Sequence, residues 1–403
     1  YTKFAVRGDA IVFAVSIAAA FLGFVVRLIL SKNLSLEDFG LFYSVFAFLG
    51  LLSVFKTLGF DRAPAKFIPE FQHENKDNLI KSSIVYAAIV HLITNAVIIL
   101  LVFLLANYLS ANFFHNNKAG IVLKLMAIAF FIDSFVLILK YVFQGFQKMS
   151  LFAGIDFIRM SLTAIFLILA FKFYQGILVP TIAYVVVPAI LLFIYAPVFF
   201  TRVFPGFINA DTIWDKILLK RISKYSIFVM ATTLGTVVLN YTDSLVLTYF
   251  RSLEEVGLYN VASPIAKVLT YFPLAIMSVL IPLSSELWTK KKMSVLKAGI
   301  ESLYKYSMIF ILPLALALFS FSELAINATF GSKFLPAANA LRILSIGMLF
   351  STLYGVNVSF FSGIGKPEIT SKIVYSGALF NFVSDIILIP SMGINGAAIT
   401  TTI

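Results

Sequence analysis

Ionisable side chains inside long apolar segments are the residues of this sequence that most need a chemical explanation. The principal ones are Lys267, Arg27, Lys56, Asp243 and Asp133. A charge near the middle of a hydrocarbon core costs roughly 2.5–3.5 kcal/mol, so such a residue is expected to have a partner or a function. A buried cation can bind an anionic group, and a buried carboxylate can bind a proton or a cation.

Lys267 is the deepest of these charges. It lies in the apolar segment 256–285, which also carries three prolines. Pro264 has no amide hydrogen to donate to the carbonyl of Asn260, which predicts a bend one turn before Lys267. We expect Pro264 to act as a hinge and Lys267 to line a substrate cavity. The alternative is a lysine paired within its own half of the protein.

Arg27 and Asp243 lie near the outer ends of the first and seventh apolar segments. The two could meet as a gate, with Asp243 also a candidate for ion coupling, or Arg27 could extend to the membrane interface. Lys56 lies at the inner end of the second segment. We expect it to extend to the interface in the same way, where it is also well placed to bind an anionic head group. Arg27 and Lys56 join Lys267 as candidate substrate-binding cations.

Asp133 lies in the fourth apolar segment without an obvious local cation, which makes it a candidate for proton or sodium coupling. Asp385 and His91 are weaker candidates for the same role. Asp156 and Arg159 are three residues apart on one predicted helix, so we expect them to neutralise each other.

The catalytic and metal-binding motifs that this sequence could contain are incomplete or absent. The stretch SGIGKPE at 362–368 resembles a phosphate loop, but Phe360 stands where the first glycine should be and Pro367 replaces the required Ser or Thr. There is no HExxH motif, and the three histidines lie in separate segments. No catalytic residue, metal site or cofactor is therefore expected, and an ATP-driven pump or a hydrolase has little support.

Composition identifies a membrane protein. Of 403 residues, 60% are hydrophobic and only 12% are charged, against about a quarter charged in soluble domains. The absence of cysteine excludes disulfides and thiolate metal sites. Eleven complete spans are predicted, at roughly 10–31, 39–60, 83–109, 119–143, 150–172, 176–200, 225–249, 256–285, 303–326, 337–361 and 369–390. A twelfth begins near 393 and stops at Ile403, so we expect the sequence to be part of a longer protein, and we see no signal peptide.

The distribution of positive charge predicts the orientation. Of 31 lysines and arginines, 19 fall at the amino terminus and in every second connection, and 5 in the connections between. The positive-inside rule then places the amino terminus in the cytoplasm of a multi-pass plasma-membrane protein. The net charge of +12 is therefore read as a topology signal facing anionic lipids and not as a nucleic-acid site.

Two short sequences occur twice at nearly the same offset. SLEDFGLF at 35–42 returns as SLEEVGLY at 252–259, and FQGFQK at 143–148 returns as FSGIGK at 361–366. The first pair is a capping-box pattern, which marks a helix start. The constant offset indicates a duplicated six-helix unit. Because six is even, both copies insert in the same direction, which predicts two parallel bundles related by a pseudo-twofold axis along the membrane normal.

The predicted organisation is an amino-terminal bundle at 1–200, a cytoplasmic linker at 201–224 and a carboxy-terminal bundle at 225–403. Apolar residues from Ile213 to Ile222 recur at helical spacing with basic residues on the other face. We therefore expect a short helix lying in the membrane interface, and a similar one at 288–304.

Three stretches carry a resemblance to a known family. They are LSLEDFGLFYSVFAFLGLLSVFKTLGFDRAPAKFIPEF at 34–71, the GxGKP turn at 363–367 and GINGAA at 393–398. With the six-plus-six arrangement, the chain resembles the polysaccharide and lipid-linked oligosaccharide flippases of the multidrug/oligosaccharidyl-lipid/polysaccharide exporter (MOP) superfamily. The resemblance implies an all-α, MATE-like pair of bundles that alternates between inward-open and outward-open states. It also implies transport of a polyprenyl-diphosphate-linked oligosaccharide to the outer leaflet for cell-surface polysaccharide or glycan biosynthesis.

The resemblance also implies roles for single residues. Lipid II flippases of the superfamily have cations on their first, second and eighth helices, and here Arg27, Lys56 and Lys267 occupy those helices. Two of the three are lysines, which are weaker bidentate phosphate partners than arginine. The implied partners are the lipid-linked glycan, membrane lipids, and H⁺ or Na⁺ as the coupling ion.

Two other functions stay open. A cation-coupled multidrug exporter of the same superfamily would use carboxylates such as Asp133 and Asp243 in a largely apolar cavity. A membrane-embedded glycan polymerase or ligase, which would be an enzyme, is expected to have a large outer loop, and the predicted outer connections are short.

Overall fold

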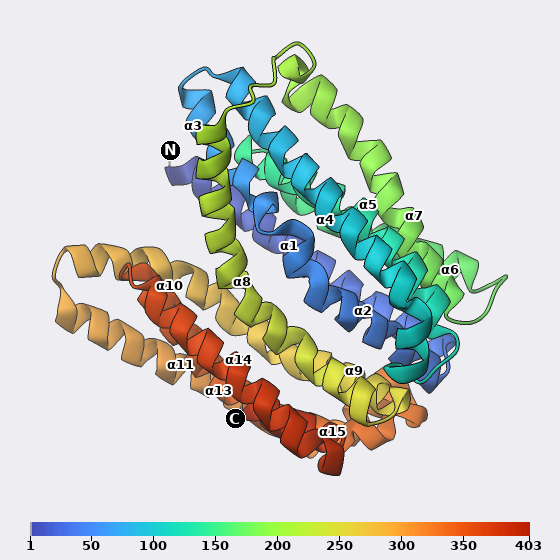
Figure 1. Ribbon diagram of the computed structural model, residues 1–403. Helices are drawn as coiled ribbons and strands as arrows, with labels where there is room; N and C mark the ends of the chain where they lie inside the picture. The colour runs from blue at the N-terminus through green and yellow to red at the C-terminus, as the bar shows by residue number, and fades with distance from the viewer. Residues whose placement is uncertain (1) are drawn as a thin grey trace. The chain divides into compact units, whose positions relative to one another are not determined.

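The computed structural model describes the backbone of residues 2–403 and the side chains of 12–270 and 280–403. The described part consists of helices joined by short turns (Figure 1). Ten of its helices are long and apolar enough to span a membrane. The all-α polytopic class predicted from composition is confirmed.

The chain forms two compact units, which are described separately. Unit 1 comprises Tyr1–Asp38 and Phe48–Val237, and unit 2 comprises Phe39–Ala47 and Val238–Ile403. The helix α2 (Leu36–Thr57) is therefore divided, with Phe39–Ala47 in unit 2 and its two ends in unit 1, and α8 is also divided. The bundle boundaries that we drew from the repeat stay a prediction, because they follow the duplication and not compactness.

Unit 1 is built from six whole helices, parts of α2 and α8, and three short helical segments. They are α1 (Thr2–Asn33), α2 (Leu36–Thr57), η1 (Phe60–Arg62), α3 (Ala63–His73), α4 (Asp77–Asn112), α5 (Ala119–Gly145), α6 (Met149–Ala170), α7 (Leu178–Val198), η2 (Phe199–Val203), η3 (Pro205–Phe207) and the first part of α8 (Lys216–Phe250). In Figure 1, α4, α5 and α7 run alongside one another. A core of buried aromatic and aliphatic side chains, including Phe67, Phe143 and Tyr195, lies between these helices.

Unit 2 contains Phe39–Ala47 of α2, the rest of α8, and the helices that follow α8. They are α9 (Leu253–Lys267), η4 (Val268–Thr270), α10 (Tyr271–Thr289), α11 (Met293–Ser320), α12 (Ser322–Phe330), η5 (Ser332–Ala337), α13 (Ala338–Gly363), α14 (Pro367–Met392) and α15 (Ile394–Thr402). The predicted eighth span is thus two helices separated by a 3₁₀ turn, which begins four residues after Pro264. A short 3₁₀ stretch inside a span is a typical site of bending.

The expected interfacial helix within 201–224 is wrong. Residues 211–215 are not helical, and the basic segment that starts at Lys216 forms the first turns of α8, which continues to Phe250. The expected helix at 288–304 is corrected in the same way, because α11 begins at Met293 and continues to Ser320. In both places the amphipathic pattern belongs to the end of a long span.

Both copies of the repeated motif begin a helix as the capping pattern predicts. The hydroxyl oxygen of Ser35 accepts a hydrogen bond from the amide of Asp38 at 3.0 Å. That of Ser252 accepts from the amide of Glu255 at 3.2 Å. Each satisfies one of the amides that a helix start leaves without a carbonyl partner.

The second repeated sequence forms the same turn twice. The amide of Lys148 donates to the carbonyl of Phe143 at 2.8 Å, and that of Lys366 donates to Phe361 at 2.9 Å. The residue before each lysine, Gln147 or Gly365, is in the left-handed region, as this kind of helix ending requires. The duplication inferred from sequence is therefore visible in local backbone geometry.

Within unit 2, α2 and α9 approach each other at equivalent glycines of the repeated motif. A Cβ added to Gly40 would overlap the carbonyl oxygen of Leu253 and lie 3.0 Å from the amide nitrogen of Gly257. Since both neighbours are backbone atoms, they cannot move aside as a side chain would. Only glycine fits at position 40 in this packing.

Gly40→Ala is expected to lower the thermal unfolding midpoint of the purified protein, because overpacking costs about 1–3 kcal/mol and here the clash is with backbone. The matched control is Gly299→Ala on α11, where an added Cβ meets nothing within 4 Å. The control should be neutral or slightly stabilising, since alanine is the better helix former. Equal midpoints for the two variants would contradict the close approach.

Candidate functional site

A cluster of charged side chains joins three helices of unit 1 inside their membrane-spanning parts. Asp133 on α5 forms ion pairs with Lys56 on α2, at 3.3 Å, and with Arg159 on α6, at 2.5 Å. The side chains of Asp133 and Arg159 are about one-fifth exposed, while that of Lys56 is 4% exposed. One carboxylate thus serves two cations, and the cluster carries a net charge of +1.

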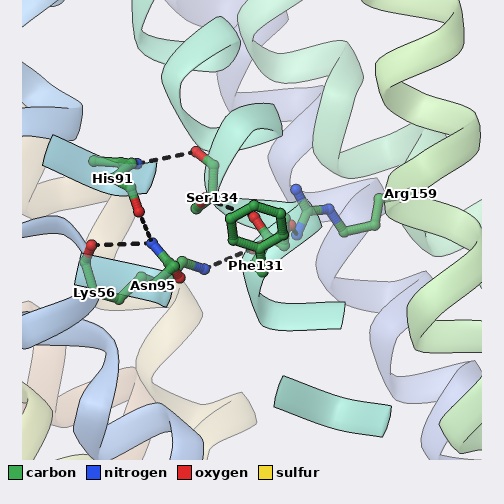
Figure 2. Close-up of polar contacts among 7 residues, drawn as sticks. Lys56, His91, Asn95, Phe131, Ser134 and Arg159 are labelled. Carbon is green, nitrogen blue, oxygen red and sulfur yellow. Dashed lines mark hydrogen bonds and ion pairs between the residues drawn. The ribbon is translucent and has the colours of Figure 1, made fainter. Parts of the chain in front are cut away.

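Polar side chains of α4 lie beside the cluster and bond to backbone carbonyls of α2 and α5. The His91 ring nitrogen Nδ1 lies 3.3 Å from the carbonyl oxygen of Ser134, and Asn95 donates to the carbonyls of His91 and Lys56 (Figure 2). Thr94 also donates to the Lys56 carbonyl, at 2.6 Å. These bonds fix the end of α2, so the Lys56 side chain is held by its backbone as well as by Asp133.

The second nitrogen of His91 is a notable feature of this region. Nε2 is buried and has no hydrogen-bond partner among the described residues, and the same holds for Nε of Arg159. Lys56 places its ammonium 3.9 Å from the ring centroid of Phe130, a distance at which a cation is attracted to an aromatic face. The cluster therefore combines excess positive charge with polar atoms that still have hydrogen-bonding capacity.

Three sequence expectations are corrected by this geometry. Asp133 has two cationic partners, although none was apparent nearby in the sequence. Lys56 does not extend to the interface, because it is buried against Asp133. Asp156 and Arg159 do not pair with each other, since Asp156 bonds to Lys140 at 2.5 Å.

A second polar cluster lies in unit 2 around Asp243. The hydroxyl of Tyr259 donates to Oδ2 of Asp243, as does that of Thr401 at 2.8 Å, and the amide of Asn381 donates to Oδ1 at 3.3 Å. Asp243 is 5% exposed. The residues come from α8, α9, α14 and α15, so four helices meet at one carboxyl group.

Asp385 of α14 extends this cluster. It is fully buried, accepts a hydrogen bond from Thr400 at 2.5 Å, and lies close enough to interact with Asp243. Two carboxyl groups together cannot easily both be ionised in a site of low polarity, so the pair favours binding of a proton or of a metal cation. The carboxyl and hydroxyl oxygens here are the ligand type that hard cations prefer.

Lys267 and Arg27 belong to different units and to neither cluster. Lys267 is exposed at the end of α9, and its ammonium lies 3.5 Å from the side-chain oxygen of Asn240. Arg27 is half-buried on α1 of unit 1. The expected contact between Arg27 and Asp243 joins residues of different units and stays a prediction, as do the substrate-binding roles of both cations.

Sequence reasoning missed most of the groups around Asp243. Tyr259, Asn381, Thr400 and Thr401 were not singled out. One signal was present: where the two motif copies differ, Phe42 is replaced by Tyr259, and the added hydroxyl is the group that bonds to Asp243. A difference between otherwise conservative copies can mark a position with a new role.

Comparisons with known proteins agree with the all-α, polytopic fold described above. The chain aligns with 96% coverage to an inward-facing MATE-family multidrug resistance transporter, which it covers to 90%, with a TM-score of 0.83 and 14% identity. It also aligns, with 97% and 84% coverage, to the lipid II flippase MurJ in an inward closed conformation, with a TM-score of 0.76 and 16% identity. At these identities the likeness shows the fold.

The family follows from sequence. Residues 5–288 match the family described as polysaccharide biosynthesis protein, and the chain belongs to it. An uncharacterized membrane protein of Methanocaldococcus jannaschii is 35% identical over 95% of this chain and 78% of its own length. A probable low-salt glycan biosynthesis flippase of Haloferax volcanii is 24% identical over 49% of this chain and 40% of its own.

Asp133→Asn is expected to destabilise the protein strongly, because it leaves Lys56 and Arg159 buried without their counter-charge, a change that costs about 3–5 kcal/mol. The matched control is Asp156→Asn, whose carboxyl is 42% exposed and whose loss should cost about 1 kcal/mol or less. Thermal unfolding in detergent measures both.

A third variant tests the charge imbalance itself. Arg159→Gln removes the excess cation and leaves Lys56 paired with Asp133, so it should destabilise less than Asp133→Asn. If Arg159→Gln were the more damaging change, Asp133 would not be the shared counter-ion of the cluster.

Proposed function

We propose that this protein is a flippase that moves a polyprenyl-diphosphate-linked oligosaccharide from the cytoplasmic to the outer leaflet by alternating access. The observation that carries the proposal is the buried cluster of Lys56, Asp133 and Arg159, which holds a net positive charge within the membrane-spanning part of a polysaccharide biosynthesis family member. A diphosphate needs such cations when it leaves water. The flippase names of the relatives support the same substrate class.

In this proposal Lys267, Arg27 and Lys56 bind the diphosphate as the protein changes state. Lys267 is the best placed for first contact, because it is exposed while Lys56 is buried. The 3₁₀ turn directly after Lys267 gives the helix a point at which to bend, with Pro264 as the hinge. The protein performs no covalent chemistry on the glycan and works in the plasma membrane with its amino terminus in the cytoplasm.

Asp243 is the proposed site of coupling to H⁺ or Na⁺. Its neighbours are hydroxyls, an amide and a second carboxyl group. Asp133, the other coupling candidate, is engaged by two cations, so neutralising it would first require those ion pairs to separate. The geometry therefore favours Asp243, with Asp385, over Asp133.

Lys267→Gln is expected to slow flipping at least tenfold in liposomes that contain a fluorescent polyprenyl-diphosphate oligosaccharide, since a charge-assisted phosphate bond is lost. Thermal stability should be unchanged, because Lys267 is exposed. The matched control is Lys291→Gln, an exposed lysine between α10 and α11. A normal flipping rate for Lys267→Gln would remove this residue from the mechanism.

The same liposomes distinguish the alternative function. If the wild-type protein exports organic cations and leaves the lipid-linked oligosaccharide where it is, it is a multidrug exporter and the flippase proposal fails.

Asp243→Asn is expected to abolish the dependence of flipping on an imposed proton or sodium gradient, because the amide cannot ionise. Tyr259→Phe keeps the carboxyl but removes one donor, so it should shift the gradient dependence without abolishing it. Asp156→Asn serves as the control and should respond to the gradient as wild type does. Full gradient dependence in Asp243→Asn would place the coupling site elsewhere.

A further inference from the structure

A pocket of about 420 Å³ opens at one end of unit 1, and none of its lining residues belongs to the two clusters described above. It is lined by Arg62, Ala65, Lys66, Tyr141, Gln144, Phe152 and Tyr225. Arg62 and Lys66 lie in the connection that the charge count places in the cytoplasm. The pocket therefore lies where the spans of unit 1 meet the proposed cytoplasmic membrane surface.

Both cations of the pocket are held over aromatic rings. The Arg62 guanidinium carbon lies 5.7 Å from the ring centroid of Tyr141, and the Lys66 ammonium lies 4.4 Å from that of Tyr225. Four residues separate Arg62 from Lys66, which places them on the same side of a helix. Both side chains are exposed, so their N–H groups can reach a ligand while the rings restrict their motion.

The carboxylates near the pocket are already engaged. Glu70 pairs with Arg221 at 2.5 Å, and Asp156 pairs with Lys140 at 2.5 Å. Asp61 is 7% exposed, and burial raises the pKa of its carboxyl group, against the opposing effects of a hydrogen bond with Thr57 and of the neighbouring Arg62 charge. None of the lining residues is acidic, so the positive charge of the pocket is not neutralised from within.

Close backbone contacts fix the walls of the pocket relative to one another. A Cβ added to Gly145, at the end of α5, would lie 2.7 Å from the carbonyl oxygen of Pro64 on α3. One added to Gly59 would overlap the carbonyl oxygen of Ser226 on α8. The segment 59–66, α5 and α8, which carry every lining residue except Phe152 of α6, therefore meet at glycines, which makes the pocket a preformed part of unit 1.

We propose that this pocket binds the phosphate ester group of a membrane lipid at the cytoplasmic surface. Arg62 and Lys66 would bind the phosphate oxygens, as charge-assisted donors do. The amide of Gln144 and the hydroxyls of Tyr141 and Tyr225 can donate further hydrogen bonds.

Two lipids present this chemistry. One is an anionic phospholipid, whose binding is independent of the proposed transport. The other is the polyprenyl-diphosphate lipid itself, in which case the pocket is a loading site and rests on the proposed function. The shared requirement is a phosphate ester at the depth of the head groups.

The test uses the purified protein in neutral detergent with two fluorescent probes, phosphatidylglycerol and a polyprenyl diphosphate, followed by anisotropy. The double variant Arg62→Gln/Lys66→Gln should lose affinity roughly thirtyfold for at least one probe, since each basic residue near a lipid surface contributes about fivefold. The matched control Lys291→Gln/Lys292→Gln removes the same charge from exposed residues of another connection and should bind as wild type does.

The binding results distinguish the two lipids and can contradict the proposed phosphate site. Loss of phosphatidylglycerol binding alone identifies a phospholipid site, and loss of polyprenyl diphosphate binding alone identifies a loading site. Unchanged binding of both probes, or an equal loss in the control pair, overturns it. Should the double variant fail to fold, Lys66→Gln and Tyr225→Leu replace it, with expected losses of about fivefold and about threefold.

Flipping is measured separately in liposomes. A protein that binds phosphatidylglycerol through Arg62 and Lys66 but does not flip the oligosaccharide would support the pocket while contradicting the proposed function. The two proposals can therefore fail independently.

Discussion

One physical constraint explains the charge cluster around Asp133: an ion inside a membrane needs a counter-charge close to it. Lys56, Asp133 and Arg159 meet this constraint by sharing a single carboxylate, which leaves one positive charge in excess. The arrangement ties α2, α5 and α6 together. In the proposed function, the excess charge of the same three side chains also binds the diphosphate.

The two halves of the duplication differ in the ionisable side chains that they bury. At the repeat offset of 217 to 218 residues, Asp133 corresponds to Ser351 and Arg159 to Gly377, while Asp243 corresponds to Val26. The first-half cluster holds two cations and one carboxyl group, while the second-half cluster is built around two carboxyl groups. In the proposed function, the first binds the anionic substrate and the second binds the coupling cation.

Features encoded by neighbouring residues could be predicted, and features that join distant residues could not. The capping serines depend on four consecutive residues, and they cap their helices as expected. The pairing of Lys56 with Asp133 spans 77 positions, and no local pattern shows it. The three-residue spacing of Asp156 and Arg159 was misleading, because α6 directs these side chains to different partners on α5. The start of α8 was missed because an amphipathic stretch that runs into a span has no sequence boundary.

The close approach of Gly40 and Gly257 has an evolutionary consequence. These residues occupy the same position in the two copies of the repeated motif, so the contact joins a residue to its own counterpart. Such self-complementary contacts are the mark of isologous interfaces in symmetric dimers. A single six-helix protein carrying this motif could make the same contact with a second copy of itself, and gene fusion would then preserve within one chain an interface first used between two.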